Sequence, residues 1–212
     1  MKPTNFSLAC SACLLMCLFA GTARADAVTI SFDELPDNTP INNVSLAGVT
    51  FGFSLDGAAS SDARFRQVGP RNQTYVQCPC LEGTAAGTLT LDFAQPTARL
   101  SFGIARVTNL NVIPGATIQL FDVGASLLST HTIDLLRVPP FNFPEGLFSY
   151  TGAPVSRTVI TFDNPLAGLR FALDNVMFEG SAAPVPEPAT LLLLGTGLAV
   201  VAVIRRRYCQ QS

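Results

Sequence analysis

Tryptophan is absent from the sequence, and histidine and lysine each occur once, as His131 and Lys2. A single histidine excludes the histidine pairs of the common zinc hydrolases, and no G-x-S-x-G motif indicates a serine hydrolase. The acidic residues of the central region are scattered along the chain, which is typical of surface groups. We therefore expect no enzymatic activity, although spacing alone leaves a glycosidase pair of carboxylates open.

Basic residues are also scarce in the central region. Residues 26–184 contain 14 acidic residues against 8 arginines, which gives a net charge of −6 with histidine neutral. Proteins that bind nucleic acid instead concentrate Lys and Arg on one face, where they contact phosphates. The charge balance therefore argues against nucleic acid as a partner.

The N-terminal segment has the parts of a secretory signal peptide. Lys2 precedes an apolar run at 8–20, and Ala23-Arg24-Ala25 supplies the small-x-small pattern that signal peptidase reads. A membrane-spanning helix is the alternative, but the run falls short of the ~20 apolar residues that a bilayer requires. We expect cleavage after Ala25 and export of the mature chain.

The C-terminal segment also has three parts: a short motif with two prolines, an apolar run at 191–204 and a basic cluster. A basic cluster in a short tail stays in the cytoplasm, so the folded domain is expected on the far side of the membrane. Each proline fixes φ and keeps the motif extended. The apolar run is short for a permanent anchor, which favours temporary retention. The motif and the cluster are Val185-Pro186-Glu187-Pro188 and Arg205-Arg206-Arg207.

This C-terminal segment, residues 184–208, resembles the PEP-CTERM sorting signal of Gram-negative bacteria that make exopolysaccharide. The resemblance implies that an exosortase, a membrane-embedded cysteine transpeptidase, recognises the motif and cuts near it. It also implies anchoring of the C-terminal helix in the cytoplasmic membrane with the domain in the periplasm, followed by a cell-surface or extracellular location. A simple tail anchor is the alternative explanation.

Residues 26–183, between these two segments, predict one all-β domain. Apolar and polar residues alternate with a period of two, which is typical of strands with one buried face, and no stretch keeps a helical period for three turns. About eight strands joined by Gly and Pro turns favour a β-sandwich of jelly-roll type. The expected strands are 28–32, 49–53, 89–93, 100–104, 116–123, 127–133, 157–162 and 169–178.

Two stretches, 54–86 and 138–154, lack this alternation and are expected to be long loops, where binding residues often lie. Two similar segments at 91–102 and 160–171 predict like strand-turn-strand units, with Pro96 and Pro165 in the turns.

Cys78 and Cys80 are the only cysteines in the central region. Export implies an oxidising compartment, so we expect a local disulfide, with free or intermolecular thiols and a metal or redox role as alternatives. Two cysteines alone do not complete a tetrahedral zinc site.

A candidate calcium site combines Asp33 and Glu34, after the first strand, with Asp174 and Asn175 in the last strand. The apolar phase slips by one residue at Asp174-Asn175, which predicts a β-bulge. In jelly rolls the first and last strands often lie side by side, so these oxygen ligands are expected to meet and to hold a structural calcium ion. Ordinary turn and bulge polar groups are the alternative.

The combined pattern favours a non-enzymatic surface or matrix protein, associated with exopolysaccharide in a biofilm. A calcium-stabilised carbohydrate-binding module of jelly-roll type is the second hypothesis. Sugar platforms are usually aromatic, but the central region contains no Trp and only Tyr75 and Tyr150, and its Phe residues fall mostly at core positions, which weighs against the second hypothesis without removing it.

If residues 1–25 are a signal peptide, the exported protein begins at Asp26. N-terminal sequencing of the protein purified from outside the cytoplasmic membrane measures this directly. Recovery of peptides from residues 1–25 in that fraction would contradict the assignment.

Overall fold

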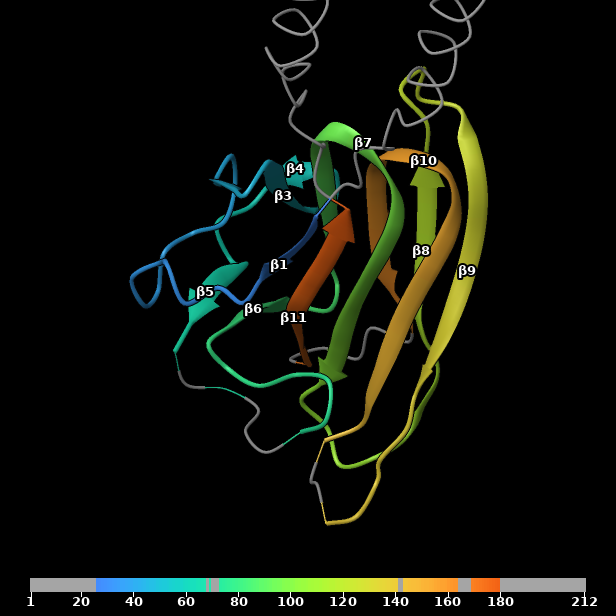
Figure 1. Cartoon of the computed structure of the whole chain (residues 1–212). Helices are drawn as coiled ribbons and strands as arrows, with labels where there is room; N and C mark the ends of the chain where they lie inside the picture. Colours follow the sequence, from blue (N-terminus) through green and yellow to red (C-terminus); the bar gives the residue numbers. More distant parts are fainter. Residues whose placement is uncertain (1–25, 68, 70–72, 141–142, 164–168, 180–212) are drawn as a thin grey trace, which may run out of the picture. The chain divides into compact units, whose positions relative to one another are not determined.

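The computed structural model describes residues 26–67, 69, 73–140, 143–163 and 169–179 (Figure 1). These residues form strands and connections without a helix, which confirms the all-β prediction. No helix among them is long and apolar enough to cross a membrane. The expected signal peptide and sorting segment lie outside the described residues. The strands are β1 Ala27–Ile30, β2 Ser45–Leu46, β3 Val49–Leu55, β4 Ala58–Ala59, β5 Arg64–Arg66, β6 Cys80–Thr84, β7 Thr88–Arg106, β8 Val112–Phe121, β9 Leu127–Leu135, β10 Glu145–Phe162 and β11 Arg170–Glu179.

The period-two pattern of the sequence accounts for the buried face of most strands. In β7, Leu89 and Leu91 are fully buried, whereas Thr88 and Thr90 between them are partly exposed. Successive side chains of a strand point to opposite faces, so one face of β7 enters the core and the other meets solvent. β6 departs from this pattern because four of its five residues are buried, and no alternation marks it in the sequence.

β7 and β10 are the two long strands, and they pair with each other in antiparallel register from Glu145↔Ala105 to Thr161↔Thr88. The first part of β7 also pairs with β3, and the second part pairs with β11. The hydrogen-bonded order is β5-β6-β11-β7-β10-β8-β9, and β1 pairs with β11. Both long strands curve strongly in Figure 1, so each contributes to two parts of the sheet.

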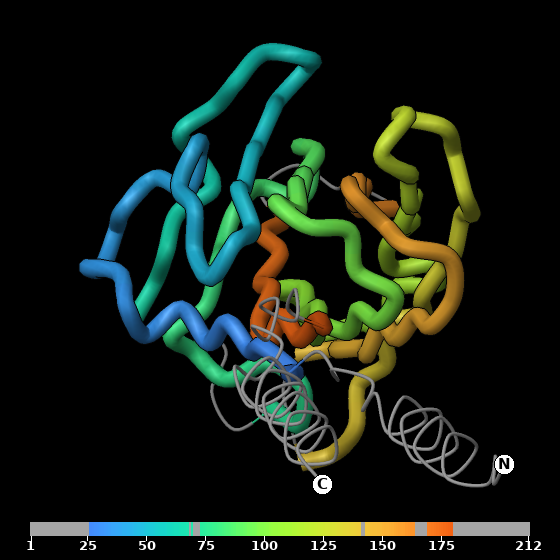
Figure 2. The backbone as a smooth tube through the Cα atoms, turned by 45° about the horizontal axis from the view of Figure 1, so that its top comes forward, coloured from blue at the N-terminus to red at the C-terminus, as the bar shows by residue number. Residues whose placement is uncertain are grey.

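Aromatic contacts show that these two parts face each other across one core. Phe53 of β3 and Phe162 of β10 both contact Phe171 of β11, with ring centroids 5.9 and 4.0 Å apart. Phe93 of β7 meets Phe178 of β11 at 5.5 Å. All five rings belong to the same buried cluster. The sheet therefore folds over itself as a two-layer sandwich; Figure 2 shows residues 26–66 (blue to teal) and the β8–β9 hairpin (yellow) on opposite sides of β11.

The turn expected at Pro96 is wrong, because β7 runs through this position without a break. Pro96 is exposed, and the β7–β10 register jumps there from Val155↔Thr97 to Arg157↔Asp92. The residues between these pairs have no partner in β10, so the missing N–H of proline removes no ladder hydrogen bond. Pro165, expected in the matching turn, lies outside the described residues.

The two expected loops are also shorter than the sequence indicated. β4, β5 and β6 lie within 54–86, and β10 begins at Glu145, inside 138–154. β4 and β5 are too short to display a period of two, and the first part of β10 contains Gly146 and Gly152, which break the apolar pattern.

The contacts of Phe171 predict a large loss of stability on truncation. Phe171 is fully buried between the two layers, so Phe171→Ala is expected to lower the free energy of unfolding by about 3–5 kcal/mol. Leu147→Ala is the control, because this side chain is 50% exposed and its loss is expected to change stability by about 0.5 kcal/mol or less. Urea denaturation measures both variants, and equal losses would contradict the packing described.

Candidate functional site

The sequence-predicted site residues fall into two groups. The sorting motif Val185 to Pro188 and the cluster Arg205 to Arg207 lie outside the described residues. The candidate metal ligands and the two cysteines lie within them: Asp33 and Glu34 follow β1, Asp174 and Asn175 belong to β11, and the cysteines lie at the start of β6.

The bulge expected in the last strand is confirmed. The register of β11 against β7 shifts between Asp174 and Met177, and Asn175 has a φ of 53°. Asparagine tolerates this left-handed conformation better than most residues. β11 pairs with β6 before the bulge and with β1 after it, so the bulge lies where one neighbour replaces the other.

The pairing of β1 with β11 confirms that the first and last strands lie side by side. Burial is the main reason that the pKa of Asp174 rises from its ordinary value of 3.8 to about 6; hydrogen bonds from Gln77 and Asn175 oppose the rise, and nearby Asp33 adds to it. Among the described residues, Asp33, Glu34 and Asp174 do not gather their oxygens within 4.8 Å. Calcium binding by these residues stays a prediction.

Asp174 and Glu145 instead bind the backbone of segment 73–77, which precedes β6, through their carboxylates. Glu145 accepts hydrogen bonds from the amides of Thr74 and Tyr75 at 2.7 Å and from that of Val76 at 3.3 Å. Asp174 Oδ2 accepts from the amide of Gln77 at 2.9 Å. Two buried carboxylates thus bind four consecutive amides, an arrangement that offsets the cost of burying both charges.

Small residues on the sheet allow this segment, 73–77, to lie close against it. A Cβ added at Gly103 would come within 2.2 Å of the carbonyl oxygen of Tyr75. Val76 is buried in a small second cluster with Cys80, Ala105 and Ala172. Segment 73–77 therefore covers the sheet face opposite the main core, and sequence spacing did not anticipate its buried anchor Glu145.

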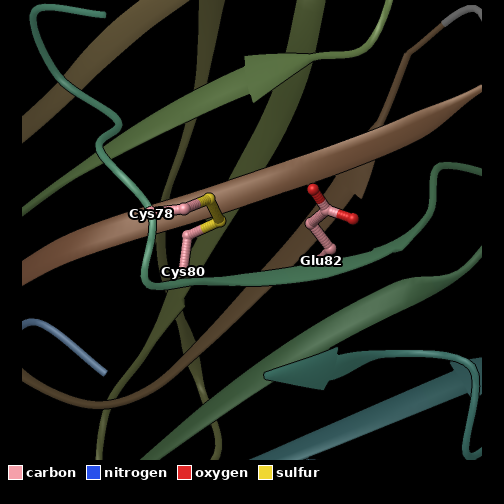
Figure 3. Close-up of side chains that lie close together, drawn as sticks. All are labelled: Cys78, Cys80 and Glu82. Atoms are coloured by element: carbon pink, nitrogen blue, oxygen red, sulfur yellow. A yellow bond between two sulfur atoms is a disulfide. The ribbon is translucent and has the colours of Figure 1, made fainter. Parts of the chain in front are cut away.

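Cys78 and Cys80 are joined by a disulfide at the end of this segment (Figure 3). The two sulfurs and a carboxylate oxygen of Glu82 lie within 4.8 Å of one another. Burial raises the pKa of Glu82, and the charges of Arg170 and Arg66 oppose this shift. Disulfide sulfurs are not thiolates, so this group offers a metal ion only the carboxylate while the bridge is intact.

An open pocket of about 330 Å³ lies on the solvent face of the sheet, where the β8–β9 turn meets β10. Arg157 of β10 is the direct cross-strand neighbour of Asp92 in β7 and of Phe121 in β8. Its Nε donates to Asp92 Oδ1, and this hydrogen bond raises the pKa of Arg157. From the sequence alone, Asp92 was one of the scattered surface acids. The feature that could have marked it as part of a site is its position, as a charged residue, on the polar face of a strand. The pocket is lined by Asp92, Phe121, Asp122, Val123, Ala125, Ser156, Arg157 and Val159.

Comparison with protein families finds one match, which covers residues 184–207 and is described as a PEP-CTERM protein-sorting motif. The chain carries a PEP-CTERM sorting motif. The motif is consistent with an exosortase substrate and implies an exported protein that is processed at the membrane. The motif match leaves the domain at residues 26–183 unassigned. A comparison of the chain with curated proteins finds no match.

Two solved structures show distant similarity to this chain. A family 29 carbohydrate-binding module from Piromyces equi aligns with 10% identity and a TM-score of 0.39, covering 74% of this chain and 91% of the module. A cleaved adhesin domain of Lys-gingipain from Porphyromonas gingivalis aligns with 9% identity and a TM-score of 0.41, covering 73% and 98%. Similarity at this level defines neither a common ligand nor a common activity.

The raised pKa of Asp174 predicts a pH dependence of stability. The folded state holds the proton of Asp174 more tightly than the unfolded state, so this group's contribution falls as pH rises from about 4 to about 6 and is constant above that range. Asp174→Asn keeps an acceptor for Gln77 and removes the titration, so its melting temperature is expected to fall less over this interval than that of the wild type. Parallel thermal melts at pH 4, 5, 6 and 7 measure the difference, and identical pH profiles would refute this role.

Proposed function

We propose that this protein is a non-enzymatic exported protein that an exosortase processes through Pro186-Glu187-Pro188, and that its β-domain acts at the cell surface or in the extracellular polysaccharide of a biofilm. The observation that carries this proposal is the PEP-CTERM motif at residues 184–207. Its order of proline motif, apolar run and basic cluster suits a segment that is held in the membrane and then cut.

Charge and redox chemistry support the same placement. Arg205, Arg206 and Arg207 follow the apolar run, and cytoplasmic retention of such a cluster leaves the domain outside the cytoplasmic membrane. The Cys78–Cys80 disulfide suits an oxidising extracytoplasmic compartment.

Carbohydrate binding is a second candidate function for the β-domain. The pocket between Phe121, Asp92 and Arg157 favours it, because it combines one aromatic ring with charged hydrogen-bonding groups on an open sheet face. A structural calcium ion at Asp33, Glu34, Asp174 and Asn175 belongs to the same candidate, and loss of thermal stability with chelator is its expected signature.

Replacement of Pro186, Glu187 and Pro188 by alanine is expected to block processing while it preserves membrane insertion. The apolar run and its arginines remain, so orientation and retention persist. The variant should accumulate at full C-terminal length in the membrane fraction of a host with an exosortase, where the wild type loses its tail. Membrane fractionation measures where the variant and the wild type accumulate, and mass analysis of C-terminal peptides shows whether each has lost its tail.

Substitution of Arg205, Arg206 and Arg207 by serine is the control, because it weakens retention whether or not an exosortase acts. A wild-type protein that keeps its tail equally in hosts with and without an exosortase would leave only the tail anchor as an explanation.

A further inference from the structure

The solvent face of one layer of the sandwich carries an ordered set of polar side chains. Five adjacent strands, β3-β7-β10-β8-β9, form this layer (Figure 1). The register places Thr90, Val159, Gln119 and Thr130 in one row across β7, β10, β8 and β9. The next row contains Thr88, Thr161, Thr117 and Thr132 in the same strands. Their neighbours Leu89, Ile118 and Ile160 are fully buried, so the residues of both rows, all polar except Val159, point away from the core.

The pocket described above forms one corner of this polar face. Arg157 and Asp92 form its first row with Phe121, two positions along each strand from the row of Val159. The pocket volume of about 330 Å³ lies at the small end of the range of ligand sites, ~300–1,000 Å³. The corner therefore suits one small ring, and the threonine rows offer hydroxyl groups to further units.

The polar groups of the pocket are held in place before any ligand arrives. Asp122 Oδ1 accepts from the amide of Ser126 at 2.8 Å, which fixes its carboxylate in the β8–β9 turn. The ion pair with Asp92 uses only the Nε of Arg157, and within the described residues its two terminal amino groups have no hydrogen-bond acceptor. Ser156 also lines the pocket, but its Oγ is buried, so its hydroxyl is not counted among the groups offered to a ligand. Donors and acceptors for a ligand thus converge on one volume.

The chemistry of these groups selects among ligands. Two carboxylates and one guanidinium give the pocket a net charge of −1 at neutral pH, which disfavours anions such as phosphate or uronate. The ring of Phe121 and the side chains of Val123 and Val159 offer apolar surface beside the charged groups. A pyranose matches this combination, because its hydroxyls both donate to carboxylates and accept from a guanidinium while its C–H faces pack on apolar side chains.

We propose that this pocket, at Asp92, Phe121, Asp122, Ser156 and Arg157, binds one sugar residue of a neutral glycan. The chain of this glycan continues over the threonine rows across β7, β10, β8 and β9. The inference deepens the carbohydrate-binding candidate above and is independent of how the tail is sorted. It places the ligand on the open sheet face, away from segment 73–77 and from the expected calcium ligands.

Isothermal titration of the full-length protein, purified in mild detergent from a host without exosortase, tests the proposal. The neutral probes are cellohexaose, laminarihexaose, mannohexaose and xylohexaose, and hexagalacturonate is the acidic probe. At least one neutral probe is expected to bind, and more tightly than hexagalacturonate. Arg157→Ala and Phe121→Ala are each expected to weaken that binding about tenfold or more.

Arg99→Ala is the matched control, because it also breaks an exposed ion pair of this domain, with Glu179, outside the pocket. It is expected to change the affinity less than about twofold. Arg157→Lys provides a second variant that keeps the positive charge beside Asp92 and removes the planar fork; it is expected to bind more weakly than wild type even if Arg157→Ala unfolds.

Three results would overturn the proposal: no binding of any neutral probe, equal affinities of wild type, Phe121→Ala and Arg157→Lys, or preference for hexagalacturonate. Membrane fractionation reports sorting separately. Loss of glycan binding therefore leaves the exosortase proposal intact, and failure of sorting leaves the glycan proposal intact.

Discussion

The pairing of β7 with β10 is the contact on which the rest of this structure depends. These strands run together from Glu145↔Ala105 to Thr161↔Thr88, with register shifts between Thr151 and Arg157. Below the shifts they pair beside β11, and above them they continue into the layer of β3 and β8. Such shifts allow a strand to bend from one layer to the other while most backbone groups stay paired. The same pairing sets Arg157 opposite Asp92 and so builds the corner pocket.

Buried charge holds the other side of the domain together. Segment 73–77 has little apolar surface of its own, and Glu145 and Asp174 bind it through its amides. Burial raises the pKa of Asp174 to about 6, so this anchor is made at an electrostatic cost that the neutral form avoids. Gly103 and Ala105 leave room for the segment. The two outer faces of the sandwich therefore differ: segment 73–77 covers one of them, and the other is open and rich in hydroxyl groups.

Local sequence patterns predicted the parts of the fold that depend on neighbouring residues. Period-two alternation located most strands, and the slip at Asp174-Asn175 identified the bulge. The same pattern failed at Pro96, because a change of apolar phase marks a bend and a turn alike. The pocket and the anchor of segment 73–77 join residues that lie far apart in the sequence: 65 positions separate Arg157 from Asp92, and 71 separate Glu145 from Thr74. Only the strand register brings these residues together, and a single sequence does not reveal that register.

The motif at 184–207 links this chain to export, because its chemistry concerns how the chain is held at the membrane and released. The intact mass of the protein released from its native host tests this account most directly. The account predicts a chain that begins at Asp26 and ends near Pro188, without the apolar run and the arginine cluster. A released or membrane-bound protein whose mass includes all residues through Ser212 would contradict it.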